Sequence, residues 1–207
     1  MNFTGSIGYG EKCVYDIIGK IGDLDVKETY ESALNVLSSN LSIHVDQKRI
    51  FYMGGSHGGF IGGHLMADPQ RSGTFTGGFL LLSPALDLLG NTVASDLIDW
   101  SFFETGLPFD FQTPRFPDLK DMESLYKASP TSKLQKAALN PSVRSLMIVG
   151  EMDRRTPNYN AIRWHQMLLS QGISSQLYVL PKTGHSLMGV LQEKFECLLT
   201  TEFLSNE

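Results

Sequence analysis

The sequence has 207 residues, of which 42% are hydrophobic, and its formal net charge is -5. A chain of this length and composition can bury a full core, which indicates one globular domain of α/β size. It has no cluster of lysine and arginine and no bilayer-spanning run, so neither nucleic-acid nor membrane partners are expected. The first residues lack a basic stretch followed by an apolar stretch, so we expect no secretory leader and a cytoplasmic location.

The first predicted elements are a helix and a strand. The helix covers residues 25–40, where Asp25 and Glu28 have the spacing of a capping box and apolar residues follow at helical spacing. The strand is a short apolar run at residues 50–53, bounded by polar residues and glycines, which is typical of a strand buried on both faces. A second helix is expected just after Ser56.

Three further strands are predicted from apolar runs at residues 77–84, 144–150 and 175–181. Between the last two, residues 156–172 predict a helix with Thr156 as N-cap, Pro157 at the first helical position and Gly172 as C-cap.

The last predicted helix carries an apolar stripe made of Leu187, Val190, Leu191, Phe195 and Leu198. Residues 85–130 are rich in Phe, Pro and Asp without a clean period, and we interpret them as an irregular excursion above the sheet edge. Strands that alternate with helices predict a mostly parallel sheet with helices on both faces, within a single α/β domain over residues 1–207.

The stretch GGSHGG at residues 54–59 places a serine between a predicted buried strand and a predicted helix. A serine on so tight a turn has a strained backbone, so Gly54 and Gly58, two residues before and after Ser56, are expected to need no side chain. The Ser56 hydroxyl would then be exposed at the C-terminal edge of the sheet, with the His57 amide aimed at a developing oxyanion. The alternative is a glycine-rich turn with a capping serine, which this setting disfavours.

A serine nucleophile needs a base, and the base needs an orienting carboxylate. Asp153 follows one predicted strand and His185 follows the next, so the order Ser56, Asp153, His185 is that of an α/β hydrolase. Glu151 is the rival carboxylate, but Asp153 is favoured because its side chain is expected to project toward the next loop. The remaining histidines are interpreted as packing or surface residues: His44, His57, His64 and His165.

Four segments together resemble the catalytic domain of the prolyl oligopeptidase family of serine peptidases: NFTGSIGYG, GGSHGGF, GEMDRRTP and PKTGH. The segment LIDWSFFETGLPF, residues 97–109, and the paired arginines are similar to the acylaminoacyl-peptidase group of that family. The resemblance covers essentially the whole chain. It implies that Ser56 is the nucleophile, His185 the base, Asp153 its orienting residue and the His57 amide one oxyanion donor.

The resemblance also implies substrate-binding residues. Arg155 is similar to an arginine that contacts substrate backbone carbonyl groups in the family, and its alternative is a surface or ion-pairing role. Trp100, Phe102 and Phe103 match the part of the family that lines an apolar specificity pocket, and their alternative is core packing.

Two features depart from the family pattern. Thr4 stands where the family has an arginine. The family's preceding β-propeller and its HGGP turn, which provides a second oxyanion donor, are not found in the sequence. The chain is therefore expected to be an N-terminally incomplete α/β-hydrolase domain that starts inside or just after the fourth strand of the hydrolase sheet.

The resulting prediction is a serine hydrolase that releases an N-acylated amino acid from short N-blocked peptides through a Ser-His-Asp acyl-enzyme. Two alternatives stay open, namely an esterase of the same fold for small substrates, and a non-catalytic fragment or interaction module that retains the triad by descent. Cys13 and Cys197 lack partners at metal-binding or disulfide spacing, so no metal or other cofactor is expected. The unpaired apolar strand of an incomplete sheet leaves association into a homo-oligomer open.

Overall fold

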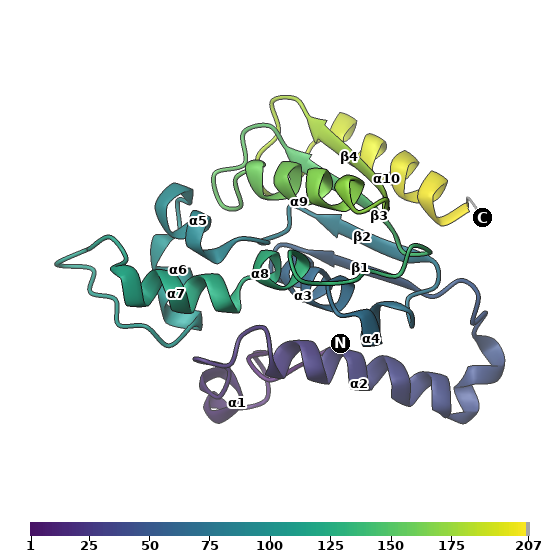
Figure 1. Ribbon diagram of the computed structural model, residues 1–207, viewed down its shortest axis with the longest axis horizontal. Coiled ribbons are helices and arrows are strands. Elements are labelled where there is room, and N and C mark those ends of the chain that lie inside the picture. Colours follow the sequence, from purple (N-terminus) through teal and green to yellow (C-terminus); the bar gives the residue numbers. More distant parts are fainter. Residues whose placement is uncertain (206–207) are drawn as a thin grey trace.

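The computed structural model describes residues 1–205. In chain order, the elements are α1 (Glu11–Tyr15), α2 (Leu24–Ser38), the short 3-10 helix η1 (Asn40–His44), β1 (Phe51–Gly55), α3 (His57–Met66), α4 (Pro69–Ser72), β2 (Gly78–Leu82), α5 (Leu88–Ala94), α6 (Ile98–Glu104), α7 (Leu119–Ala128), α8 (Pro130–Leu134), β3 (Arg144–Gly150), α9 (Tyr159–Ser170), β4 (Ser174–Leu180) and α10 (Val190–Ser205) (Figure 1).

The four strands form one parallel sheet in the order β1-β2-β3-β4. All four predicted strands are confirmed, and β3 coincides with its predicted range. Because the strands are parallel, their C-terminal ends share one edge of the sheet. The turns that follow β1, β3 and β4 therefore open on the same side of the molecule.

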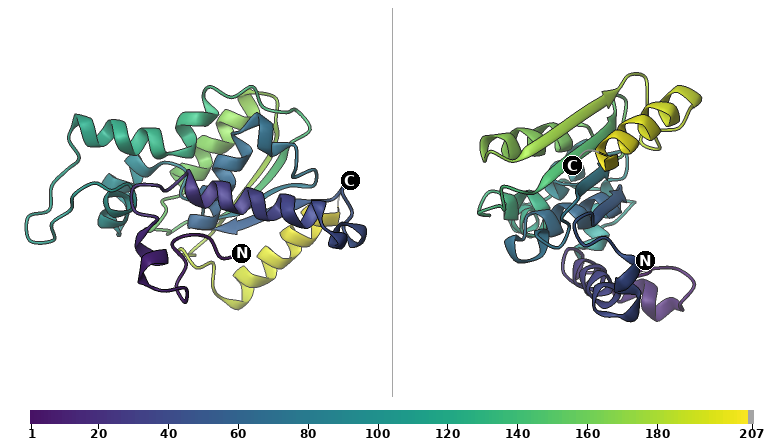
Figure 2. Two further views of the ribbon diagram at one scale, coloured as in Figure 1. Left: turned by 90° about the horizontal axis from the view of Figure 1, so that it is seen from below. Right: turned by 90° about the vertical axis from the view of Figure 1, so that its right-hand side faces the viewer.

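Alternate residues of the central strands supply two apolar layers, as the period-two geometry of a strand requires. Phe79 and Leu81 of β2 belong to a large core that includes side chains of α3 and α9, whereas Leu80 belongs to a smaller core that includes Phe203 of α10. Figure 2 shows α9 and α10 on opposite faces of the sheet. The predicted parallel sheet with helices on both faces is therefore confirmed.

The β1 side of the sheet is open. Among residues 1–205, β1 pairs only with β2, and α2 lies alongside this region (Figure 1). Tyr52 points into the core, but 55% of the Met53 surface is exposed. The prediction that this strand is buried on both faces is therefore wrong for the structure as described, because β1 is an edge strand.

Two predicted helix starts are corrected. The first helix begins at Leu24, and the Asp25 carboxylate accepts from the Gly22 and Val26 amides instead of capping the helix with Glu28. The helix predicted to be capped by Thr156 begins at Tyr159, because the Thr156 side chain is buried beside Asp153. In both cases a contact distant in sequence or a tight turn outweighs the local capping preference.

The final helix forms, but its apolar stripe does not face the sheet. Phe203 is buried and Leu199 is partly buried against the smaller core, whereas Leu191, Phe195 and Leu198 are more than half exposed. Leu187 is buried in a turn before the helix begins. No helix within residues 1–205 is long and apolar enough to cross a membrane.

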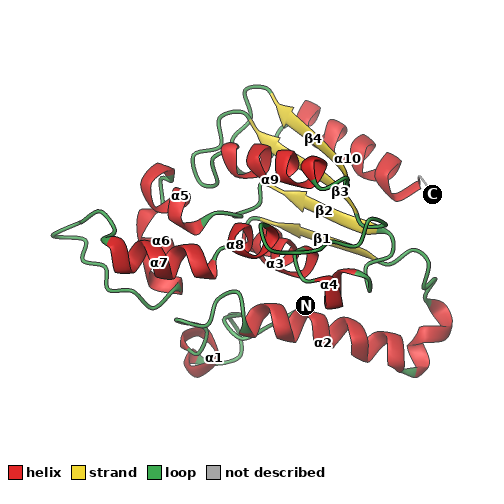
Figure 3. Ribbon diagram, in the orientation of Figure 1, coloured by secondary structure: helices red, strands yellow, loops and turns green. Residues whose placement is uncertain are grey.

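Residues 85–130 contain three helices, α5, α6 and α7, although the sequence suggests an irregular excursion. The longest stretch without helix or strand covers residues 105–118, which join α6 to α7 (Figure 3). These helices project beyond the C-terminal ends of the strands (Figure 1). They therefore stand next to the turns on which the candidate catalytic residues lie.

Candidate active site

Ser56 lies on the turn between β1 and α3 with a strained backbone, φ 53° and ψ -113°. A positive φ is uncommon for a residue with a side chain and marks a turn that its surroundings must hold in place. The Ser56 amide donates to the Leu82 carbonyl at 2.8 Å, and the Phe60 amide donates to the Ser56 carbonyl at 3.0 Å. The Ser56 hydroxyl does not cap α3, so the capping alternative is not supported.

The turn around Ser56 needs glycine at one of the two expected positions and at one other position. A methyl group on Gly54 would lie 2.5 Å from the Gly58 carbonyl oxygen, and one on Gly59 would lie 2.5 Å from Cβ of Pro84. A methyl group on Gly58 would meet no atom within 4 Å outside its own helix backbone. The turn therefore requires glycine at 54 and 59, whereas at 58 the expected steric need is absent.

The three candidate triad residues meet at the C-terminal edge of the sheet. Nε2 of His185 lies 3.0 Å from the Ser56 hydroxyl, and Nδ1 of His185 lies 2.9 Å from Oδ2 of Asp153. The serine and the histidine are separated by 129 residues in the chain. The geometry is that of a nucleophile hydrogen-bonded to a base whose other nitrogen faces a carboxylate.

Asp153 is buried and has several donors. Its Oδ1 accepts from the Arg155 amide at 2.9 Å and the Thr156 amide at 3.0 Å, and the Thr156 hydroxyl lies 2.9 Å from Oδ2. Burial by itself would raise the pKa of Asp153, but the hydrogen bonds from His185 and Thr156 outweigh it, and the pKa is lowered. The carboxylate therefore stays ionised and accepts from the imidazole.

The rival carboxylate and the other histidines lie elsewhere. Oε2 of Glu151 accepts from the Lys182 amide at 2.8 Å and is not bonded to His185. His64 is buried with Nε2 3.0 Å from the Ala128 carbonyl, and burial lowers its pKa well below 6.5. His165 lies 2.8 Å from the Ser175 hydroxyl. None of these side chains contacts the Ser56 hydroxyl.

The His57 side chain has a partner that the sequence does not indicate. Its Nε2 lies 2.9 Å from Oδ2 of Asp25, whose side chain is fully buried. The sequence predicts a helix cap at Asp25, and no local pattern links it to a residue 32 positions away. Only the packing of α2 against α3 brings the two side chains together.

Arg155 is held at the edge of the site by an ion pair. Its Nε lies 2.8 Å from Oδ1 of Asp96, and both side chains are close to half exposed. The Ser95 hydroxyl donates to the Arg155 carbonyl at 2.7 Å, and the Asp96 amide donates to the Arg154 carbonyl at 2.8 Å. These hydrogen bonds and the ion pair thus bind the segment that joins α5 to α6 to the turn that carries Asp153.

A cavity of about 110 Å³ adjoins the Ser56 hydroxyl. Its walls are formed by Ser56, His57, Ala85, Ser95, Leu97, Trp100, Arg155 and Thr156. Burial raises the pKa of the neighbouring Glu104, although a hydrogen bond from the Trp100 side chain opposes the shift. This indole therefore has a polar anchor at the edge of the cavity.

Of the three aromatic residues expected in the pocket, the structure brings only Trp100 to it. Phe102 is fully buried and packs against Phe109, with the Arg115 guanidinium over its ring. Phe103 is 53% exposed and does not line the cavity beside Ser56. Helical geometry explains the difference, because consecutive residues of α6 point in different directions.

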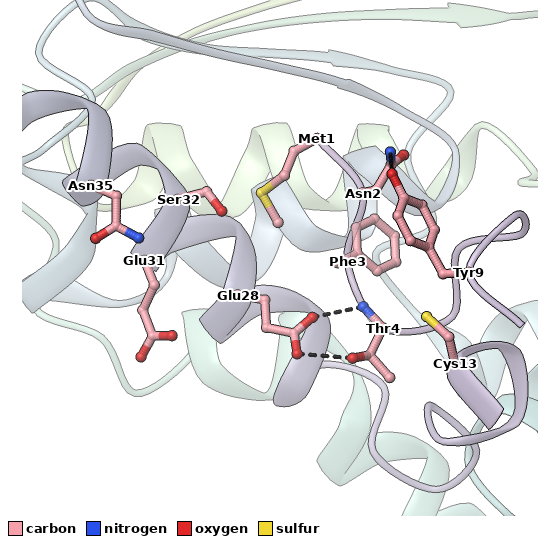
Figure 4. A pocket seen from close by; sticks show the side chains of 10 residues that line it. All are labelled: Met1, Asn2, Phe3, Thr4, Tyr9, Cys13, Glu28, Glu31, Ser32 and Asn35. Carbon is pink, nitrogen blue, oxygen red and sulfur yellow. Dashed lines mark hydrogen bonds between the residues drawn. The ribbon is translucent and has the colours of Figure 1, made fainter. Parts of the chain in front are cut away.

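The N-terminal segment is hydrogen-bonded to α2 through Thr4, the position where the family pattern has an arginine. The Thr4 amide and hydroxyl donate to the two Glu28 carboxylate oxygens at 2.6 and 2.9 Å, as the dashed lines of Figure 4 show. The uncharged threonine thus binds both carboxylate oxygens of this glutamate.

No group of three or more His, Cys, Asp or Glu side chains within residues 1–205 is arranged to hold a metal ion.

Comparisons with known proteins identify the family of the chain. A family model described as the prolyl oligopeptidase family matches residues 1–206. The acylamino-acid-releasing enzyme of Mus musculus is 29% identical over 206 residues, which are 99% of this chain and 26% of that protein. The enzyme of the same name from Arabidopsis thaliana is 28% identical, with 90% of this chain and 23% of that protein covered. The chain thus spans about a quarter of the length of these relatives.

Solved structures support the fold. An acylaminoacyl peptidase from Pyrococcus horikoshii superimposes with a TM-score of 0.79 at 19% identity, covering 99% of this chain and 31% of that chain. A puromycin hydrolase superimposes with a TM-score of 0.74 at 21% identity, covering 98% of this chain and 28% of that chain. The fold is therefore that of the α/β hydrolases, as the sequence predicted.

Proposed function

The chain belongs to the prolyl oligopeptidase family, and we propose that it carries the catalytic site of a serine peptidase that releases an N-acylated amino acid from short N-blocked peptides. The observation that carries the proposal is the continuous hydrogen-bonded series from the Ser56 hydroxyl through His185 to the buried Asp153. The names of the related acylamino-acid-releasing enzymes support the choice of substrate.

The proposed reaction is acyl transfer in two steps. Nε2 of His185 removes the proton from the Ser56 hydroxyl as its oxygen attacks the scissile carbonyl, and the C–N bond breaks as His185 returns the proton to the leaving amine. A water molecule, deprotonated by His185, then attacks the acyl-enzyme and releases the N-acylated amino acid with restoration of the Ser56 hydroxyl. Asp153 stays ionised and stabilises the imidazolium in both steps.

The negative charge that forms on the carbonyl oxygen needs donors. The His57 amide begins α3 directly after Ser56, so it supplies one donor and the partial positive charge of a helix N-terminus. Gly54 and Gly59 allow the close approaches that hold this turn, which keeps the amide beside the nucleophile. The strained backbone of Ser56 thus accompanies an arrangement that places its hydroxyl beside the His57 amide.

Arg155 and the adjacent cavity supply substrate contacts in this proposal. The Arg155 guanidinium lies at the cavity edge and can donate to a backbone carbonyl of the substrate. A volume of about 110 Å³ accommodates a small side chain or acyl group. Trp100 and Leu97 give the cavity its apolar part.

A fluorophosphonate probe tests the nucleophile, because it reacts with activated serines. We expect mass spectrometry to find the label on Ser56 alone and to find none in Ser56→Ala. His185→Ala and Asp153→Asn should each slow labelling by about ten-thousandfold or more, since the triad acts as a unit. Glu151→Gln is the matched control and should leave the labelling rate unchanged. Labelling at another serine, or greater damage from Glu151→Gln than from Asp153→Asn, would refute the assignment.

Substrate assays separate the proposed activity from its alternatives. Release of N-acetylated amino acids from blocked dipeptides supports the peptidase. Turnover of small esters with none of blocked peptides identifies an esterase of the same fold. The absence of any serine labelling identifies a non-catalytic module. A cytoplasmic location stays a prediction.

A further inference from the structure

A second carboxylate and imidazole pair includes His57, the residue directly after Ser56. Nε2 of His57 lies 2.9 Å from Oδ2 of Asp25. The other carboxylate oxygen, Oδ1, accepts from the Gly22 amide at 2.7 Å and from the Val26 amide at 2.9 Å. The Asp25 side chain is fully buried, so its orientation is set by these three donors.

The pairing dictates which nitrogen of the His57 ring carries the proton. An ionised carboxylate only accepts hydrogen bonds, so Nε2 must be the donor. In a neutral imidazole the other nitrogen, Nδ1, is then an unprotonated acceptor. No hydrogen bond to Nδ1 of His57 occurs among residues 1–205, and 25% of the His57 side chain is exposed. The ring therefore presents an acceptor that no described group uses.

Aromatic neighbours fix the plane of the ring. Phe3 stacks on His57 with 5.6 Å between ring centroids and 16° between planes, and Phe60 packs at 5.4 Å. Trp100 lies nearly perpendicular to it, with 5.9 Å between ring centroids. Figure 4 shows Phe3 next to Thr4, whose two bonds to Glu28 anchor this segment to α2. His57 and Trp100 both line the cavity beside the Ser56 hydroxyl.

We propose that Asp25 is a positioning residue that fixes the tautomer of His57, and that His57 accepts a hydrogen bond from the acylamino N–H next to the scissile carbonyl. The proposal rests on the function proposed above. It makes His57 a specificity-determining residue through its side chain, in addition to the oxyanion contact of its amide. The site would then favour acylamino substrates over isosteric analogues in which oxygen replaces the N–H.

The substitution Asp25→Asn tests this role with almost no change of shape. The Gly22 and Val26 amides both donate to Oδ1, so they hold the side-chain oxygen of the introduced asparagine in that place. The side-chain nitrogen of the asparagine then faces Nε2 of His57 and donates to it. This reverses the polarity of the hydrogen bond and moves the imidazole proton to Nδ1, the atom proposed to accept from the substrate. Asp23→Asn is the matched control, because Asp23 lies two residues earlier and makes no capping hydrogen bond.

The first measurement is nitrogen NMR of the 15N-histidine-labelled chain at pH 8, with the His57 signals assigned by comparison with His57→Gln. We expect the proton on Nε2 in the unmodified protein and in Asp23→Asn, and on Nδ1 in Asp25→Asn. A proton on Nδ1 in the unmodified protein, or on both ring nitrogens, would overturn the proposal. This readout does not depend on catalysis, so it decides the tautomer even if the proposed enzymatic function fails.

The second measurement compares the rates at which two nitrophenyl esters acylate Ser56. One is the ester of N-acetylalanine, and the other is the ester of its oxygen isostere, O-acetyl-lactate. After correction for their rates of alkaline hydrolysis, we expect the unmodified protein to prefer the N–H ester about tenfold, since one neutral hydrogen bond distinguishes them. Asp25→Asn should remove that preference, whereas Asp23→Asn should keep both the preference and the rate of fluorophosphonate labelling of Ser56. An equal loss on both esters, or an intact preference, would overturn the proposed role. Failure of fluorophosphonate to label the unmodified protein would instead refute the serine-hydrolase function.

Discussion

Replacing Gly54 by alanine should damage both the fold and the site, although the change adds only one methyl group. The methyl carbon would lie 2.5 Å from the Gly58 carbonyl oxygen, 2.6 Å from its carbon and 3.0 Å from the Tyr52 ring. Overpacking of this kind costs about 1–3 kcal/mol. Moving the Gly58 carbonyl also strains the hydrogen bond that it accepts from the Tyr52 hydroxyl at 2.6 Å, and losing that bond costs about a further 1 kcal/mol.

The matched control is Gly58→Ala, because a methyl group there meets no atom within 4 Å. Alanine in place of glycine within a helix stabilises by about 0.5–1 kcal/mol. Thermal unfolding followed by circular dichroism should therefore place the midpoint of Gly54→Ala below that of Gly58→Ala by about 5–20 °C. Fluorophosphonate labelling should slow in Gly54→Ala alone, since the clash moves the turn that carries Ser56. Equal midpoints, or a larger loss in Gly58→Ala, would refute this account of the turn.

Three further predictions follow from individual contacts. The pKa of Asp153 is lowered in the folded chain, so its ionised form stabilises the fold above about pH 4, and that contribution disappears as the pH falls through the folded pKa. In urea unfolding, Asp153→Asn should therefore lose less unfolding free energy between neutral and acidic pH than the parent chain does. An unchanged dependence of unfolding free energy on pH would contradict this prediction. Arg155→Ala should slow hydrolysis of a blocked dipeptide at least about tenfold more than hydrolysis of a small aryl ester, which lacks a second carbonyl group. Asp96→Ala should have a weaker effect in the same direction. Equal losses on both substrates would mean that Arg155 has only a structural role. Because β1 is an apolar edge strand, light scattering should show that the chain self-associates. Met53→Lys should raise the monomer fraction more than Tyr178→Lys on β4 does. A monomeric parent chain would refute the edge argument.

The sequence by itself determined the strands and the turns that follow them. Runs of apolar residues predict parallel strands, and this local signal is strong at β2 and β3 because central strands need apolar side chains on both faces. The order of Ser56, Asp153 and His185, each placed after its own strand, then required only the rule that parallel strands share a C-terminal edge. For that reason the meeting of these three side chains could be anticipated across 129 residues of chain.

Tertiary structure alone decided the features in which distant or crowded side chains compete with local preferences. Asp25 has the sequence setting of a helix cap, but burial against α3 turns its carboxylate toward His57. Gly58 resembles a required glycine in the motif, but the space around it is open, whereas Gly59 is constrained by Pro84, which lies beyond the next strand. Such contacts depend on how helices pack on the sheet, and no periodicity within one segment of the chain records that packing.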